Sequence, residues 1–130
     1  MNKKVLFLLL NLFFCCAFVS AQEAQKSDLQ KRAEAVDPKK NIASARSLYI
    51  QAFNDYANKG QIRQGVECAV KATALYYKEN FYKETFDLLR RTDQVITSSK
   101  QSSSDKAASH YLVTKEKLRS EERVSRNAET

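Results

Sequence analysis

Glycine, proline, tryptophan and histidine are nearly missing from this sequence. Its 130 residues include two glycines, one proline, one histidine and no tryptophan. Strand-to-strand turns usually need glycine, asparagine or proline, so a sandwich or barrel with many hairpins is strongly disfavoured. The two glycines, Gly60 and Gly65, also cannot form a glycine-rich loop that holds phosphate groups. The length allows one small domain at most.

The first 21 residues are typical of an export signal rather than of a folded element. Lys3 and Lys4 give a basic start, and residues 5–19 are almost entirely apolar. Val19 and Ala21 then supply small residues at the minus-three and minus-one positions that a signal peptidase reads. We therefore expect a signal peptide over residues 1–21, cleavage after Ala21 and a periplasmic location. A retained membrane anchor is the alternative, although an apolar run of about 15 residues is short for a span of about 20.

The cysteines leave the exported chain without an internal disulfide. Cys15 and Cys16 lie in the leader, and neither follows the small residue that lipoprotein processing requires. Cleavage leaves Cys68 as the single cysteine of residues 22–130. Small exported domains often depend on disulfides for stability. This chain must depend on helix packing, on partners, or on being part of a longer chain.

Apolar residues recur every three or four positions beyond the leader, which predicts an all-α fold. Very short turns between the helices predict antiparallel helical hairpins. Asp37 and Pro38 form a good helix start, and Gly60 is suited to end that helix. The expected elements are helices over residues 38–59, 61–78 and 81–96, a polar loop over 97–104, and a fourth helix capped by Ser104 or Asp105.

Weaker patterns flank this helical repeat domain, which we place at residues 38–118. Residues 22–37 carry a thin apolar stripe and are expected to form a short, weakly held helical lead-in. Residues 119–130 contain one sizeable aliphatic side chain and are expected to form a fraying polar tail. The fourth helix is expected to cover the third with four residues: Ala108, Tyr111, Leu112 and Leu118.

Two segments 20 residues apart, residues 56–65 and 76–85, share one pattern. Each has an aromatic residue, a tight turn at Gly60 or Asn80, then an apolar residue and a small residue. This pattern resembles the tetratricopeptide repeat, a helical hairpin of about 34 residues. The resemblance implies a right-handed array of about four helices.

The sequence also departs from the tetratricopeptide pattern. Gly65, Thr85 and Thr92 replace the usual alanines, the terminal proline is missing, and the two matches share the middle helix. A generic antiparallel helical bundle is therefore the alternative.

A second resemblance concerns residues 44–61 and 67–94. These segments are similar to the N-terminal parts of exported, multi-repeat, histidine-kinase-like sensor proteins of Bacteroides-type bacteria. In those proteins a periplasmic repeat array precedes a membrane helix and a cytoplasmic two-component signalling domain. The resemblance implies that this chain is the input end of such a sensor, apparently truncated, and that the rest of a longer sensor is one possible partner.

No residue pattern indicates catalysis, a cofactor or a metal. His110 follows a serine near a helix start, as kinase phosphoacceptors do, but their acidic continuation is missing, which favours a surface or interface histidine. A metal site needs about four convergent ligands. Cys68 lies among apolar helix neighbours and is expected in the core, because a reactive cysteine needs exposure and nearby cations.

Basic residues outnumber acidic ones, 22 to 15, and the excess persists without the leader. Acidic residues interleave the basic clusters, and export removes most nucleic acid from reach, so no nucleic-acid partner is expected. Weak contact with anionic lipid headgroups or glycans stays open.

Two function classes remain. The favoured one is a non-catalytic exported module that binds a protein or peptide in a repeat groove, as the sensor end of an envelope signalling protein. Tyr77 lies off the main apolar stripe and is the candidate partner-binding residue, although a packed role fits equally well. The alternative is a small exported helical protein that self-associates or lies on a membrane surface.

Overall fold

Helices make up most of the chain that the computed structural model describes, which comprises residues 2–5 and 25–129. The packed helices are α2 (Asp28–Ala35), α3 (Ile42–Asn58), α4 (Ile62–Lys78), α5 (Tyr82–Ser98) and α6 (Ser103–Ala128). The described residues contain no strand, so the all-α prediction is confirmed. The expected cleavage site after Ala21 lies outside the described residues.

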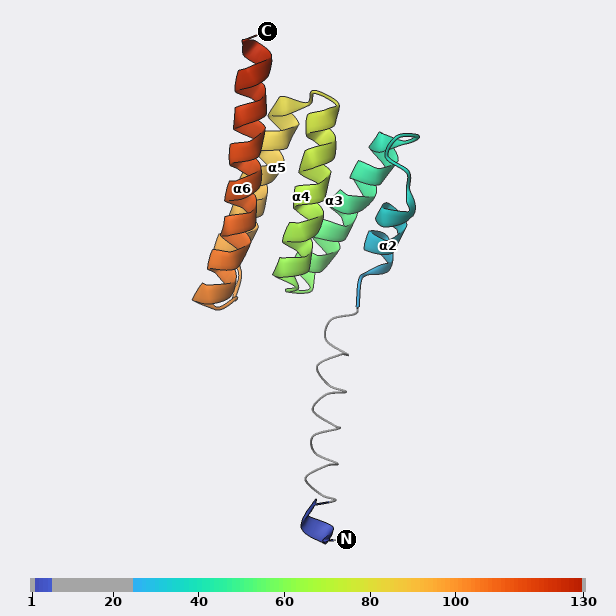
Figure 1. Ribbon diagram of the computed structural model, residues 1–130, viewed down its shortest axis with the longest axis vertical. Helices are drawn as coiled ribbons and strands as arrows, with labels where there is room; N and C mark the ends of the chain where they lie inside the picture. The colour runs from blue at the N-terminus through green and yellow to red at the C-terminus, as the bar shows by residue number, and fades with distance from the viewer. Residues whose placement is uncertain (1, 6–24, 130) are drawn as a thin grey trace.

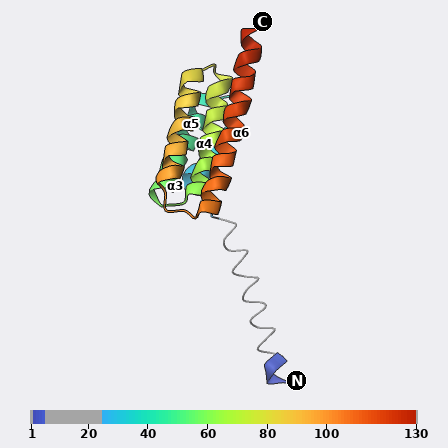
Figure 2. The same ribbon diagram turned by 90° about the vertical axis from the view of Figure 1, so that its left-hand side faces the viewer.

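Consecutive helices lie side by side in chain order, from α2 at one edge to α6 at the other (Figure 1). α4 packs against α3, α5 and α6, and α2 packs against α3. Arg91 of α5 donates a hydrogen bond to Asn54 Oδ1 of α3, so these two helices are also neighbours. Figure 2 shows α3 and α5 toward one side and α6 toward the other. The helices therefore alternate between two layers, with α4 in the centre.

The turns after α3 and α4 are built in the same way. Helices α3, α4 and α5 each have 17 residues and begin 20 residues apart. Gly60 and Asn80 have φ angles of 73° and 62°, in the left-handed region. The next N–H in each turn donates to the carbonyl of Tyr56 or Tyr76, at 2.9 and 3.0 Å. These are Schellman caps, and they account for the 20-residue similarity in the sequence.

α3 begins later than the Asp-Pro pair predicts. Asn41 is its N-cap, and the Asn41 side chain accepts a hydrogen bond from the Ser44 N–H at 3.1 Å. Asp37 caps a separate turn instead, where its Oδ1 accepts from the Lys39 N–H at 2.9 Å. The predicted start at Pro38 is wrong because a second capping residue follows within four positions.

α6 differs most from expectation. Ser102 is its N-cap, so the helix starts before Ser104, and it continues to Ala128 through the segment expected to be a polar tail. Its buried residues are Ser109, Val113, Glu116 and Ser120. Tyr111 and Leu118 are 64% and 61% exposed, and Ala108 is exposed as well. Leu112 is partly buried and packs toward α4 and α5, as predicted. The other three residues of the predicted covering stripe are wrong, because α6 meets those helices mainly through Ser109, Val113, Glu116 and Ser120.

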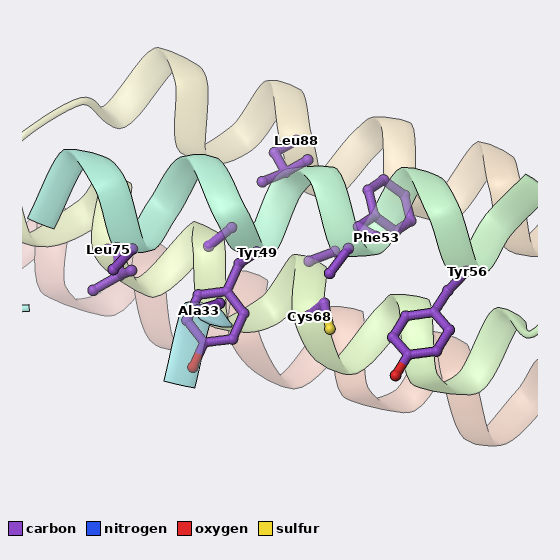
Figure 3. Close-up of a cluster of buried hydrophobic side chains, with 11 residues drawn as sticks. Ala33, Tyr49, Phe53, Tyr56, Cys68, Leu75 and Leu88 are labelled. Atoms are coloured by element: carbon purple, nitrogen blue, oxygen red, sulfur yellow. The ribbon is translucent and has the colours of Figure 1, made fainter. Parts of the chain in front are cut away.

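Two clusters of buried side chains meet on α4. The first joins α2, α3, α4 and α5 (Figure 3), and its larger members are Tyr49, Phe53, Tyr56, Leu75 and Leu88. The second joins α4, α5 and α6 through Ile62, Val66, Leu89, Ile96 and Val113. Because α4 contributes to both clusters, it holds the two ends of the array together.

Candidate functional site

A groove runs between α3 and α5, over α4. Its volume is about 250 Å³, and its lining comes from all three helices. The apolar part consists of Ile50, Tyr76 and Leu88, and the charged part consists of Glu84, Asp87 and Arg91. The groove therefore offers an apolar floor with acidic and basic groups beside it.

Side chains of α3 and α5 hold the charged rim in place. The Arg91 guanidinium lies 5.5 Å from the centre of the Phe53 ring, in addition to its hydrogen bond to Asn54. Lys83 donates to Asp87 at 2.6 Å, and this hydrogen bond holds the pKa of Asp87 below its usual value. Asp87 is therefore a carboxylate at neutral pH.

Tyr76 is fixed by a charged and aromatic cluster at the α4–α5 turn. The Arg46 guanidinium lies 4.5 Å from the Tyr76 ring centre and 5.6 Å from that of Phe81. Arg46 also forms an ion pair with Glu79, and the two side chains are only 17% and 19% exposed. This cluster connects α3 to the turn that follows α4.

Tyr77 lies in a different place, a hollow between the α4–α5 turn and the last turns of α6. This basic hollow has a volume of about 340 Å³ and is lined by Tyr77, Lys78, Asn80, Arg123, Arg126 and Asn127. The groove between α3 and α5 contains the neighbouring Tyr76 instead. The expected contact residue is therefore at a surface, but outside the groove between α3 and α5.

Aromatic and amide groups surround Tyr77. Its ring lies 5.3 Å from the Tyr82 ring, and the Arg123 guanidinium lies 5.4 Å from its centre. Asn127 Nδ2 donates to the hydroxyls of Tyr77 at 3.5 Å and Tyr82 at 3.3 Å. The Tyr82 hydroxyl donates in turn to Asn80 Oδ1 at 2.9 Å. Burial raises the pKa of Tyr77, so its phenol stays neutral.

The hollow carries unbalanced positive charge. Arg126 pairs with Glu122 at 2.6 Å. Lys78 and Arg123 form no ion pair with any carboxylate of residues 25–129. The sequence pattern does not predict the α6 residues of this hollow, because they lie in the segment expected to fray. Their spacing of three and four residues would have placed them on one helix face.

The other candidate residues have structural partners. His110 Nδ1 lies 2.8 Å from Asp93 Oδ1 and links α6 to α5. Cys68 is fully buried, and burial raises the pKa of its thiol to about 11. In the described part of the chain, no group of three His, Cys, Asp or Glu side chains is placed to hold a metal ion.

Comparisons of the chain with known protein families, curated proteins and solved structures find no match. Among residues 2–5 and 25–129, no helix combines the length and apolar character needed to cross a membrane. Two hollowed surfaces of the described chain are candidate binding sites: the groove between α3 and α5 and the basic hollow beside Tyr77.

Proposed function

We propose that this chain is a non-catalytic, exported helical-repeat module that binds a protein or peptide. The supporting observation is the groove between α3 and α5, with Ile50, Tyr76 and Leu88 forming its apolar floor. A peptide can place apolar side chains on this floor and pair polar groups with Glu84 or Arg91. Such recognition uses shape and a few polar anchors, and it requires no catalytic group.

The proposal includes a tetratricopeptide-like array that forms the input end of an envelope signalling protein. The repeated Schellman turns and the alternation of helices between two layers support the array. Two successive helices with their turns occupy 40 residues here, whereas the tetratricopeptide unit has about 34. The proposed unit is thus a longer variant of that hairpin.

Export is tested at the N-terminus. We expect the exported protein to begin at Gln22, because Val19 and Ala21 place small residues at the minus-three and minus-one positions of the cleavage site. N-terminal sequencing of the protein from the periplasmic fraction measures this directly. A retained Met1, or a lipidated Cys15 or Cys16, would contradict the export route.

Peptide binding is tested by selecting peptides from a random display library on residues 22–130. We expect selected peptides to bind variants Ile50→Ala and Arg91→Ala about tenfold more weakly, since each substitution removes a floor or rim contact. Arg63→Ala is the control, because Arg63 is exposed and lies outside the groove lining. A library that yields no binder, or binders that ignore both groove substitutions, would contradict the proposal.

One observation favours the alternative of self-association. Tyr111 and Leu118 are exposed and lie seven residues apart, on one face of α6. If that face joins two copies, the wild-type chain sediments as a dimer and the variant Tyr111→Ser/Leu118→Ser sediments as a monomer. A wild-type monomer at all concentrations favours the binding module.

A further inference from the structure

We infer that the basic hollow beside Tyr77 binds a carboxylate of an acidic segment on the partner. The inference rests on the proposed function in one respect: it assumes that the carboxylate belongs to the protein or peptide that the module binds. The hollow itself is defined by side chains of α4, the α4–α5 turn and α6.

Positive charge is the first reason. Acidic side chains accompany many basic ones elsewhere on the surface, as in the pairs Lys83–Asp87 and Lys59–Asp55. In the hollow, Arg126 has Glu122, while Lys78 and Arg123 form no ion pair within residues 25–129. Two cations therefore line the hollow without an ion pair to a carboxylate of residues 25–129.

The C-terminal ends of two helices reduce the positive potential of the hollow and so affect which anion it binds best. α4 ends at Lys78 and α6 ends at Ala128, so both helices direct their C-terminal ends toward the hollow. Each C-terminus carries a partial negative charge of about half an elementary charge. These partial charges offset part of the charge of Lys78 and Arg123. The remaining field suits a monoanion such as a carboxylate better than a phosphate dianion.

The position of the Arg123 guanidinium also favours a carboxylate ligand. Its guanidinium lies over the Tyr77 ring, a contact that restricts the orientation of the guanidinium plane. A planar guanidinium binds a planar carboxylate through two parallel hydrogen bonds. The rings of Tyr77 and Tyr82 provide an apolar wall for the methylene groups of a glutamate side chain.

The test uses a hexaglutamate peptide with blocked ends as the probe, titrated into residues 22–130 at low ionic strength. We expect saturable binding that Arg123→Gln and Lys78→Gln each weaken by about tenfold, as for loss of a charge-assisted hydrogen bond. Arg123→Lys keeps the charge but loses the paired hydrogen bonds, so it should also weaken binding. Circular dichroism of each variant confirms that α4 and α6 are intact.

The matched control is Lys115→Gln, which removes one charge from an exposed position on the same helix and should change affinity less than about twofold. Equal losses in Lys115→Gln and Arg123→Gln would show diffuse attraction and overturn the inference. Absence of hexaglutamate binding would overturn it too, whether or not inorganic phosphate or phosphatidylglycerol vesicles bind.

The hexaglutamate test of the hollow and the peptide-library test of the groove can fail independently of each other. If hexaglutamate binds through Arg123 but no library peptide binds the groove between α3 and α5, the peptide-binding proposal is rejected. Carboxylate binding at the hollow is then retained. Groove-dependent peptides without hexaglutamate binding would reject the hollow alone.

Discussion

Gly65 lies where α4 passes close to α3. A Cβ atom at this position would lie 3.3 Å from Tyr56 Cβ and 3.4 Å from the Phe53 carbonyl oxygen. The small residue in the 20-residue pattern thus has a physical cause, which the sequence alone already indicated. Gly60 is different, because it has φ of 73° and open space around its Cα. The two glycines therefore serve close packing and turn geometry respectively.

Gly65→Leu should lower the free energy of unfolding by about 1–3 kcal/mol through overpacking against α3. Gly65→Ala should cost less, because only the Cβ must be accommodated. Urea denaturation measures both changes. Gly60→Ala is the comparison, where a cost of about 1 kcal/mol should arise from backbone strain without a steric clash. A Gly65→Leu protein as stable as the wild type would contradict the close approach.

Cys68 should behave as a core residue. Its thiol is buried and has a pKa of about 11, so almost no thiolate exists in the folded protein at about pH 8. We expect residues 22–130 to react with a disulfide reagent such as DTNB only as fast as they unfold. Reaction in urea should be rapid. Rapid reaction of the folded protein would show that the thiol is accessible.

α2 is a short helix that packs on α3, and the Tyr56 side chain of α3 forms two hydrogen bonds with its N-terminal end. The Tyr56 hydroxyl accepts a hydrogen bond from the Ser27 N–H at 2.7 Å and donates one to Gln30 Oε1 at 2.6 Å. Gln30 is 5% exposed, and Ala33 adds a buried contact. The thin apolar stripe in the sequence indicated a helix here, but no periodicity could show that a hydroxyl connects it to the array.

Tyr56→Phe should cost about 1–2 kcal/mol, because Gln30 loses its buried hydrogen-bond donor. Amide hydrogen exchange should become faster in α2 while protection in α4 stays high. Tyr49→Phe is the control, since its ring lies in the same cluster and its hydroxyl forms no hydrogen bond within the described residues. Unchanged exchange in α2 would show that its apolar contacts from Leu29, Ala33 and Val36 hold it without the hydroxyl.

α6 shows why its buried face could not be predicted. A ranking by hydrophobicity selects Tyr111 and Leu118, which are exposed, over Ser109 and Ser120, which are buried. Small side chains allow α6 to approach α4 and α5, and packing distance is not visible in a hydropathy pattern. The buried stripe of α3 was predictable because it contains Tyr49, Phe53 and Tyr56. On α4, Ala69 and Thr73 lie at helical spacing from Ile62 and Val66, which made that stripe predictable although its members are smaller.

Glu116 should make the stability of α6 depend on pH. It is 5% exposed, and burial raises its pKa, with Arg119 at 3.6 Å offsetting part of that effect. The folded state therefore binds the proton more tightly than the unfolded state. The stability contributed by this group is present below the unfolded pKa and is lost as pH rises through the folded pKa.

Glu116→Gln should thus be more stable than the wild type at neutral pH, with the difference shrinking toward about pH 4, near the usual glutamate pKa. Urea denaturation across this pH range measures the difference. Glu121→Gln, at an exposed position of the same helix, should show little change. A difference that does not vary with pH would contradict a raised pKa.

The molecule as a whole should unfold in one step, because both core clusters include residues of α4. Phe53→Ala removes a ring from the first cluster, and Ile96→Ala removes a side chain from the second. Each should cost about 2–5 kcal/mol. Circular dichroism and tyrosine fluorescence should give coincident transitions in the wild type and in both variants. Separate transitions would show that the two ends of the array are independent.

The binding surfaces were only partly predictable. The sequence pattern placed Tyr77 off the main stripe, and Tyr77 lies in the lining of the basic hollow, where its role as a partner contact stays a prediction. The groove between α3 and α5 depends on how three helices pack, and the basic hollow joins residues 50 positions apart, such as Tyr77 and Asn127. Local periodicity does not report such distances. Both surfaces therefore required the folded chain.

Because α3, α4 and α5 begin at equal intervals, only an even number of helix-turn units can be duplicated within this chain without changing its arrangement. Each unit of 20 residues contains one helix and one turn, and each turn reverses the chain direction. Duplicating a single unit would invert the direction of every later helix and move it to the opposite layer. Duplicating two units together would preserve both direction and layer. An array of this kind can therefore lengthen in steps of two helices without changing the face that each existing helix presents.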